Sequence, residues 1–210
     1  MEICCYNQLP STQKFLQELI VSQKIENEIA ILAKIQTNGQ GSGSNSWIGT
    51  RGDLFFSIAI KKGNLPSDLP LQSSSIYFGN LVQAVLRNYD SGVWLKWPND
   101  IYLESKKVGG IITQMQGNFL ILGIGLNMAK KEGFASLDMG VTPLEVAQLI
   151  IQKIKVVQSW KQIFSKYRLE FEKSKGHMTK LGEQKIAMQD AKLLFDGSIE
   201  VDGKRIFSLR

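Results

Sequence analysis

The chain has 210 residues, of which 43% are hydrophobic and 21% are charged. This is the composition of an ordinary soluble globular protein, and the length suffices to bury a core without a disulfide or a structural metal. The net charge of +6 permits an anionic partner, but the basic residues are dispersed and form no zinc-finger, RNA-recognition or clear helix-turn-helix pattern, which argues against nucleic-acid binding.

The N-terminal residues carry no basic stretch followed by a long apolar run, so the sequence predicts no signal peptide. The longest apolar stretch, residues 119–129, contains two glycines and an asparagine and is shorter than the roughly 20 residues that cross a bilayer. The only cysteines, Cys4 and Cys5, are neighbours, which rarely pair, so we interpret both as free thiols in a reducing compartment. We therefore expect a cytoplasmic protein without a membrane segment.

The first part of the chain alternates strand and helix signals. A short run, residues 3–6, predicts a strand, and Pro10-Ser11-Thr12 offers a helix start with a capping hydroxyl. The Ile-, Ala- and Leu-rich segment 28–36 and the run 53–60 each predict a buried strand. Between the first two strands, apolar residues recur at helical spacing, at Phe15, Leu16, Leu19 and Ile20.

A Gly-, Ser- and Asn-rich tract, residues 37–47, separates the second and third predicted strands and ends at Trp47. Such a tract is most often a flexible linker. Here it lies between two strand signals, and a long loop inside a compact sheet is more often functional than structural. We therefore consider it a candidate binding loop.

The remaining elements complete an α+β pattern. Residues 71–89 predict a helix, and Pro143 begins a helical region that extends to about residue 175 with a break near Ser159. Near the end, Asp196-Gly197 and Asp202-Gly203 separate short alternating strands. The pattern predicts a mixed, mostly antiparallel sheet flanked by helices in residues 1–178, and a small β domain in residues 179–210. Between the helices, strands are predicted at 93–97, 107–116 and 119–127.

The most informative motif is Lys96-Trp97-Pro98-Asn99-Asp100, followed by Lys107 in Lys107-Val108-Gly109-Gly110-Ile111. We expect Asp100 and Lys107 on either side of a short turn. A lysine pair here would ordinarily lie in a solvated loop, but the two glycines that follow permit close approach of a ligand or another backbone. A lysine at such a strand can bind a carboxylate or phosphate, and the aspartate can orient or deprotonate an amine.

Several segments occur in the order and spacing of biotin protein ligases, so the chain resembles this family between residue 3 and about residue 130. The Lys-Trp-Pro-Asn-Asp motif with its following lysine is the specific part. The resemblance implies a catalytic domain similar to that of class II aminoacyl-tRNA synthetases. Residues 207–210 resemble the closing strand of the family's SH3-like C-terminal domain. The matching segments are 10–13, 36–47, 96–100, 107–112 and 123–128.

The resemblance implies an ATP-dependent biotin–[biotin carboxyl-carrier protein] ligase of the monofunctional type. Such an enzyme joins biotin to ATP as biotinyl-5′-adenylate and releases pyrophosphate. It then transfers biotin to a lysine in the biotin carrier domain of a carboxylase. Mg²⁺ would arrive with ATP, held mainly by phosphates and waters and not by protein ligands. The resemblance leaves a homodimer open.

The resemblance also assigns roles to residues of this chain. The catalytic residues are Lys107, which neutralises the carboxylate and α-phosphate as they join, and Asp100, which acts on the acceptor amine. The biotin-binding residues are Ser11, Thr12, Gln13, Gln36, Gly39, Gln40, Gly41, Ser42, Lys107 and Gly110. The residues that bind ATP or the adenylate are Gln40, Ser42, Trp47, Arg51, Asn99, Lys107, Ile111, Gly125 and Asn127.

The chain departs from the family pattern in two places. Family members usually carry several arginines in the glycine loop, whereas the corresponding positions here are Gln40, Ser42, Gly43 and Asn45. Backbone N–H groups, Lys107 and Arg51 must then bind the anions, and we expect weaker biotin binding than in relatives that carry the arginines. The chain also begins almost at the first catalytic strand, so we expect no DNA-binding helix-turn-helix and no repressor activity.

Two other functions remain open. A lipoate–protein ligase shares the expected fold and the acyl-adenylate chemistry, although the Lys-Trp-Pro-Asn-Asp motif and the tryptophan-closed loop favour biotin. A non-catalytic binding module is favoured by the loss of the loop arginines and disfavoured by the presence of both Asp100 and Lys107. The inventory of one histidine, no His/Cys cluster and no P-loop argues against triad hydrolases, transition-metal enzymes and P-loop nucleotide enzymes.

Overall fold

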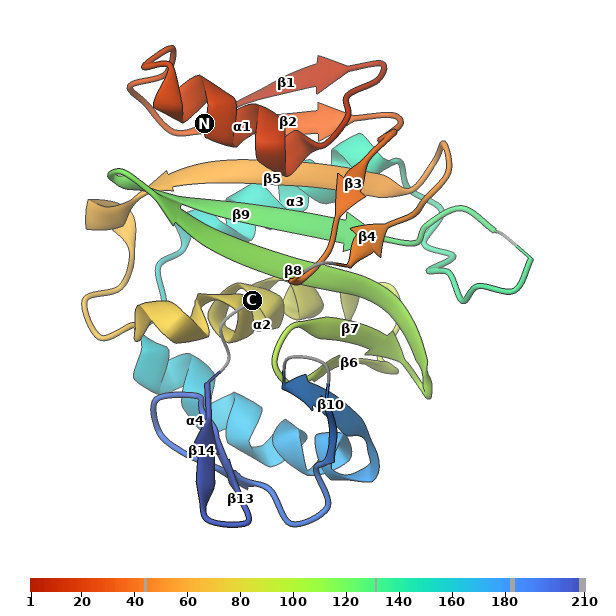
Figure 1. Ribbon diagram of the computed structural model, residues 1–210. Helices are drawn as coiled ribbons and strands as arrows, with labels where there is room; N and C mark the ends of the chain where they lie inside the picture. The colour runs from red at the N-terminus through yellow and green to blue at the C-terminus, as the bar shows by residue number, and fades with distance from the viewer. Residues whose placement is uncertain (44, 131, 182–183, 208–210) are drawn as a thin grey trace.

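The computed structural model describes residues 1–43, 45–130, 132–181 and 184–207 (Figure 1). A seven-stranded sheet has the order β1-β2-β5-β9-β8-β7-β6. Only β1 and β2 pair in parallel within this sheet, so the prediction of a mixed, mostly antiparallel sheet is confirmed. Its strands are β1 (Glu2–Tyr6), β2 (Ile29–Ala33), β5 (Leu54–Lys61), β6 (Val93–Lys96), β7 (Asp100–Leu103), β8 (Lys106–Gln116) and β9 (Phe119–Leu126).

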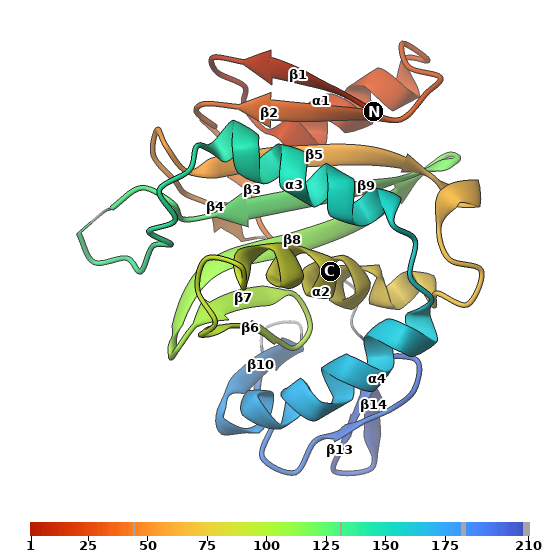
Figure 2. The same ribbon diagram turned by 180° about the vertical axis from the view of Figure 1, so that it is seen from behind.

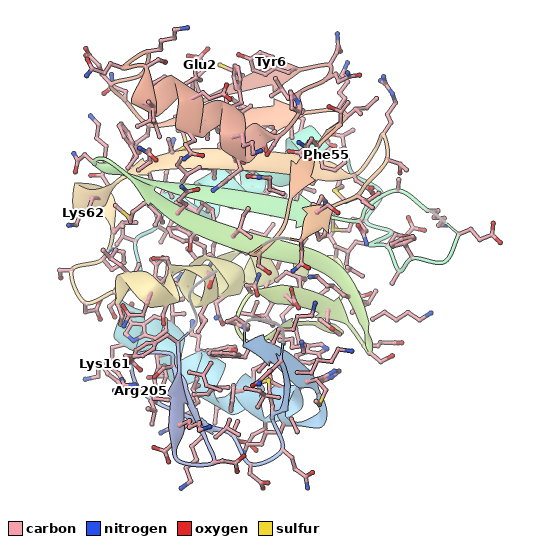
Figure 3. All side chains as sticks on the ribbon, viewed as in Figure 1. Glu2, Tyr6, Phe55, Lys62, Lys161 and Arg205 are labelled. Carbon is pink, nitrogen blue, oxygen red and sulfur yellow. The ribbon has the colours of Figure 1, made fainter. Side chains whose placement is uncertain are left out.

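Helices cover both faces of this sheet. The helix α1 (Thr12–Val21) packs on one face, and α2 (Ser74–Leu86) and α3 (Pro143–Lys155) lie on the other (Figures 1 and 2). On β5, Phe55 (labelled in Figure 3) packs in the core on the α1 side of the sheet, and Phe56 packs in the core on the α2 and α3 side. Burial on both faces explains why the sequence of β5 is almost continuously apolar.

The helices begin at polar capping residues. Ser11 accepts a hydrogen bond from Lys14 N at the start of α1, and Thr142 forms a capping box with Glu145 at the start of α3. Ser159 caps α4 (Trp160–Glu170), so the predicted break near Ser159 is confirmed. No helix in the described part of the chain is long and apolar enough to cross a membrane.

Four local features differ from the sequence predictions. The segment between Asp100 and Lys107, interpreted as a short turn, contains the strand β7, because the Pro-Asn-Asp turn signal obscured the Asp-Ile-Tyr-Leu strand. The glycine-rich tract forms a small hairpin, β3 (Gly39–Gln40) and β4 (Ser46–Trp47). The strand predicted at 28–36 is shorter, because only Ile29–Ala33 pairs with β5. The helix predicted at 71–89 begins with a 3₁₀ turn, Leu71–Ser73, which is followed by α2.

The C-terminal part consists of small sheets, as predicted. The indole N–H groups of Trp97 and Trp160 donate hydrogen bonds to Gly197 O and Phe195 O, so one turn of this part is fixed to earlier segments of the chain. The predicted closing strand 207–210 lies largely outside the described residues. The strands are β10 (Met178–Leu181) and β11 (Gln184–Ala187) in one sheet, and β12 (Lys192–Leu193), β13 (Ile199–Val201) and β14 (Lys204–Ile206) in another.

Candidate active site

A cavity lies between the start of α1, the β3–β4 hairpin and the α1 face of the sheet. Its floor is built from glycines on two paired strands, where Gly110 lies opposite Gly125 and Ile112 lies opposite Gly123. A Cβ at position 123 would lie 2.6 Å from Oε1 of Gln13, and one at position 125 would overlap the Trp47 ring. The glycines therefore permit close approach of α1 and the hairpin to the sheet.

One end of the cavity is polar. The backbone N–H and the hydroxyl of Thr12 donate to Oε1 of Gln36 at 2.7 and 3.0 Å. The hydroxyls of Thr12 and Ser57 lie 2.8 Å apart, and the Ser57 hydroxyl lies 3.4 Å from Oε1 of Gln13, so the two hydroxyl protons are shared among three possible hydrogen bonds. Ser11, Thr12, Gln13 and Ser57 are all buried, so this end presents a fixed set of donors and acceptors to a small polar ligand.

The other end of the cavity carries a charged cluster. The Nζ atom of Lys107 lies 2.6 Å from Oδ1 of Asp100, and the Nζ atom of Lys96 lies 3.8 Å from Oδ2 of the same aspartate. The side chains of Lys96 and Asp100 are 10% and 18% exposed, whereas that of Lys107 is 43% exposed. Lys107 is thus the cation of this cluster that an incoming anion reaches most easily.

A β-bulge positions Lys107. In the pairing of β7 with β8, Ile101 lies opposite Gly109, but Tyr102 lies opposite Lys107, so Val108 is an extra residue. Without it, alternation would place Lys107 and Gly110 on opposite faces of the sheet. With it, Val108 is buried in the core, and a Cβ at Gly110 would lie 3.7 Å from Nζ of Lys107.

Trp47 of β4 forms a wall of the cavity. Its indole lies over Gly125, and the Nζ atom of Lys107 is 5.8 Å from the centroid of the ring. The indole Nε1 is buried and has no hydrogen-bond partner among the described residues. A buried donor without a partner is costly in an empty cavity and useful when a bound ligand supplies an acceptor.

The charges of the cluster act on neighbouring aromatic and imidazole groups. The pKa of Tyr102 is raised by its burial and by the Asp100 carboxylate. The pKa of His177 is lowered by its burial and by the positive charge of Lys96. The Nζ atom of Lys96 also lies 5.6 Å from the centroid of the Tyr102 ring, a cation–π arrangement.

Most of the residues singled out in the sequence line this cavity. Sequence reasoning missed Ser57, although a serine within an otherwise apolar buried strand is a signal of a polar site. It also missed the backbone and apolar positions Phe56, Ile112, Gly123 and Ile124. The predicted residues that line the cavity are Ser11, Thr12, Gln13, Gln36, Gln40, Gly41, Ser42, Trp47, Asn99, Lys107, Gly110, Ile111 and Gly125.

The other predicted residues lie elsewhere. Gly39 packs behind the cavity, where a Cβ would lie 2.8 Å from Nε2 of Gln36. Arg51 is exposed and forms an isolated bridge with Asp53, outside the cavity lining. The Asn127 amide donates to Ala135 O and does not line the cavity. Asp100 lines a neighbouring cavity, into which Lys107 also extends.

Asp53 is a positioning residue that the sequence did not reveal. This buried carboxylate accepts hydrogen bonds from the backbone N–H groups of Thr50, Met128 and Ala129 at 2.8, 2.9 and 3.0 Å. It therefore fixes the segment after β9 against the loop that follows the β3–β4 hairpin.

Within the described residues, no group of three or more His, Cys, Asp or Glu side chains could hold a metal ion.

The pocket thus has a glycine floor, a polar end and, at the other end, a lysine paired with an aspartate, and a lysine in such a position can bind an anion. The model of the biotin/lipoate A/B protein ligase family matches residues 5–127, which is more than half of the chain. The chain belongs to this family.

Individual relatives agree with this assignment. A Helicobacter pylori biotin acetyl coenzyme A carboxylase synthetase, solved with bound biotinylated ATP, is 36% identical with a TM-score of 0.94, over 98% of this chain and 99% of that chain. An Aquifex aeolicus biotin protein ligase, solved with biotin and ATP, is 25% identical with a TM-score of 0.75, over 100% of this chain and 96% of that one. The bifunctional ligase/repressor BirA of Bacillus subtilis is 31% identical over 125 residues, which are 57% of this chain and 38% of that protein. The match thus spans well under half of this curated relative.

Proposed function

We propose that this chain is an ATP-dependent biotin protein ligase. The observation that carries the proposal is the continuity between the polar-ended, glycine-floored pocket and the Lys107–Asp100 pair. The likeness to the Helicobacter pylori synthetase, which extends over nearly the full length of both chains, supports it.

The reaction has two steps. A carboxylate oxygen of biotin attacks the α-phosphorus of ATP, the bond to the bridging oxygen of the β-phosphate breaks, and pyrophosphate leaves with the bonding electrons. The amine of an acceptor lysine then attacks the acyl carbon of biotinyl-5′-adenylate. AMP leaves, an amide bond forms, and the amine loses a proton.

The polar end of the pocket binds the ureido ring of biotin. The Thr12 hydroxyl is hydrogen-bonded to the Gln36 amide and to the Ser57 hydroxyl. The carbonyl and N–H groups of the ureido ring replace hydrogen bonds within this network when biotin binds. Ser11 and Gln13 complete the polar end, and the loop residues Gln40, Gly41 and Ser42 line the rest of the pocket around the biotin molecule. Gly39 acts from outside the lining, where its lack of a side chain leaves room for Gln36. Gly110 leaves room for the chain that carries the carboxylate.

Lys107 is the principal catalytic residue in this proposal. Its ammonium neutralises the biotin carboxylate and the α-phosphate as they approach, and a charge already in place stabilises the negatively charged transition state. Trp47, Asn99, Ile111 and Gly125 line the same region, where the adenylate binds. Asn127 acts from outside the cavity, by supporting the segment that Asp53 anchors.

Asp100 serves the transfer step. Its carboxylate lies between two lysines and faces the cavity next to that of biotin, so a lysine amine that enters there can transfer its proton to a carboxylate already in place.

The protein that receives biotin is the biotin carrier domain of a carboxylase. The nucleotide substrate is MgATP, whose metal ion is held mainly by phosphates and waters. We place the reaction in the cytoplasm, which the free cysteines support.

The proposed function is tested by biotin-dependent exchange of labelled pyrophosphate into ATP. The wild-type chain is expected to catalyse exchange, and Lys107→Ala is expected to lower the rate by about 100-fold or more. Lys106→Ala is the matched control, because Lys106 is the exposed neighbour that lies opposite Leu103. Exchange with lipoate but not biotin would assign the sister activity, and exchange with neither would leave a binding module.

A further inference from the structure

A second cavity, of about 270 Å³, adjoins the first on the far side of Lys107. It lies between the Lys-Trp-Pro-Asn-Asp motif and the β10–β11 hairpin of the C-terminal part. The two cavities share Ser42, Asn99 and Lys107. A ligand bound at Lys107 can therefore extend from one cavity into the other. The second cavity is lined by Ser42, Asn45, Lys96, Trp97, Pro98, Asn99, Asp100, Lys107, Met178, Thr179, Lys180 and Lys185.

The charge of this lining is strongly positive. Its charged members are four lysines and Asp100, which is already shared between Lys96 and Lys107. The excess of positive charge is therefore supplied largely by the β10–β11 hairpin. A concave surface of one sign concentrates the field and attracts a multivalent counter-ion.

The two lysines of the hairpin lie directly opposite each other. Lys180 of β10 pairs with Lys185 of β11 in the antiparallel register. An anion bound in this part of the cavity therefore meets a lysine from each strand of the hairpin.

We propose that Lys180 and Lys185 bind the β- and γ-phosphates of ATP and the pyrophosphate that leaves in the first step. This inference rests on the proposed function. The α-phosphate lies at Lys107 in that proposal, and the second cavity begins there. The lysines supply from the C-terminal hairpin the positive charge that the glycine loop lacks at Gln40, Ser42, Gly43 and Asn45.

The direct test is calorimetric titration of the full chain with inorganic tripolyphosphate, which requires neither biotin nor catalysis. The wild type is expected to bind, and the double variant Lys180→Gln/Lys185→Gln is expected to bind about tenfold more weakly or worse, as for the loss of charge-assisted hydrogen bonds. Lys204→Gln is the matched control, because Lys204 is an exposed lysine of β14 opposite Val201. Equal binding by wild type and double variant, or no binding by the wild type, would overturn the inference.

Kinetics and stability separate this role from others. The double variant should show a raised KM for ATP in pyrophosphate exchange, an unchanged Kd for biotin, and unchanged single-turnover transfer from synthetic biotinyl-adenylate. Its melting temperature should stay close to that of the wild type, because both substitutions are at exposed positions, and Lys180→Arg/Lys185→Arg should retain binding. A raised KM for the acceptor with unchanged tripolyphosphate binding would instead assign the hairpin to acceptor docking. If the wild type binds tripolyphosphate but catalyses pyrophosphate exchange with neither biotin nor lipoate, the proposed function is wrong and the anion site is retained.

Discussion

The carboxylate of Asp100 lies 2.6 Å from the ammonium of Lys107, although the two residues belong to different strands and only Lys107 is substantially exposed. Their meeting depends on the bulge at Val108, which brings Lys107 to the cavity face, and on the pairing of Asp100 with Gly110, where no side chain intervenes. Lys107 thus lines both cavities, whereas Asp100 lines only the second.

Asp100→Asn is expected to affect transfer more than adenylation. An amide oxygen still accepts a hydrogen bond from Lys107 but cannot accept a proton from the acceptor lysine, and general base catalysis contributes about 10²–10⁴-fold. Single-turnover transfer from synthetic biotinyl-adenylate to a carrier domain should slow by about 100-fold, while pyrophosphate exchange changes by less than about tenfold. Equal losses in both assays would mean that Asp100 only positions Lys107.

Gly125→Ala is expected to displace Trp47 and weaken ligand binding. A Cβ at this position overlaps the indole, and overpacking of this kind costs about 1–3 kcal/mol. Tryptophan fluorescence should shift, and the biotin Kd measured by calorimetry should rise. Gly63→Ala is a suitable control, because a Cβ there meets nothing within 4 Å. A Gly125→Ala protein that binds biotin as tightly as Gly63→Ala would show that Trp47 does not shape the pocket.

Much of the first cavity was predictable because its residues lie in short local motifs. Ser11 and Thr12 are recognised as a helix start, and Gly109-Gly110 after Lys107 indicates close approach of another group. Such patterns predict local structure alone, and the grouping of these residues into one site came from the resemblance to biotin protein ligases. The strands 107–116 and 119–127 were predictable because their apolar runs and intervening turn are local signals.

The remaining features depend on contacts between residues distant in sequence. The bulge at Val108 exists only in the pairing of β7 with β8, and a turn signal concealed β7 itself. Lys180 and Lys185 line the same cavity as Lys107 through contacts between distant parts of the chain, such as the packing of His177 on Trp94 and Tyr102, which no pattern near those lysines encodes. Ser57 was missed because its partner Thr12 lies on a helix far earlier in the chain.

Arg51→Ala distinguishes two sources for the charge that the glycine loop lacks. The sequence suggested Arg51, but this residue is exposed and lies outside both cavity linings. We therefore expect the KM for ATP and the adenylation rate to change by less than about twofold, as is usual for a surface substitution. A rise in KM comparable with that of the Lys180→Gln/Lys185→Gln variant would restore Arg51 as a phosphate ligand.

His177 is expected to make the protein less stable in mild acid. The imidazole packs against the rings of Trp94 and Tyr102, with centroids 5.3 and 5.4 Å away, and its pKa is lowered by burial and by Lys96. Near and below the ordinary histidine pKa of 6.5, the unfolded chain therefore binds more protons than the folded chain. Acidification then favours unfolding, and the free energy of unfolding rises as the pH increases through this range.

The measurement is the free energy of unfolding in urea between about pH 5 and about pH 7.5, around the ordinary pKa of histidine. His177→Phe keeps an aromatic ring between Trp94 and Tyr102 and removes the titrating group, so its stability should fall less steeply as the pH is lowered. The two proteins should differ least above the ordinary pKa, where the imidazole of both folded and unfolded wild type is neutral. Parallel pH profiles for wild type and variant would show that the imidazole binds protons equally in the folded and unfolded chain, and that other groups carry the acid sensitivity.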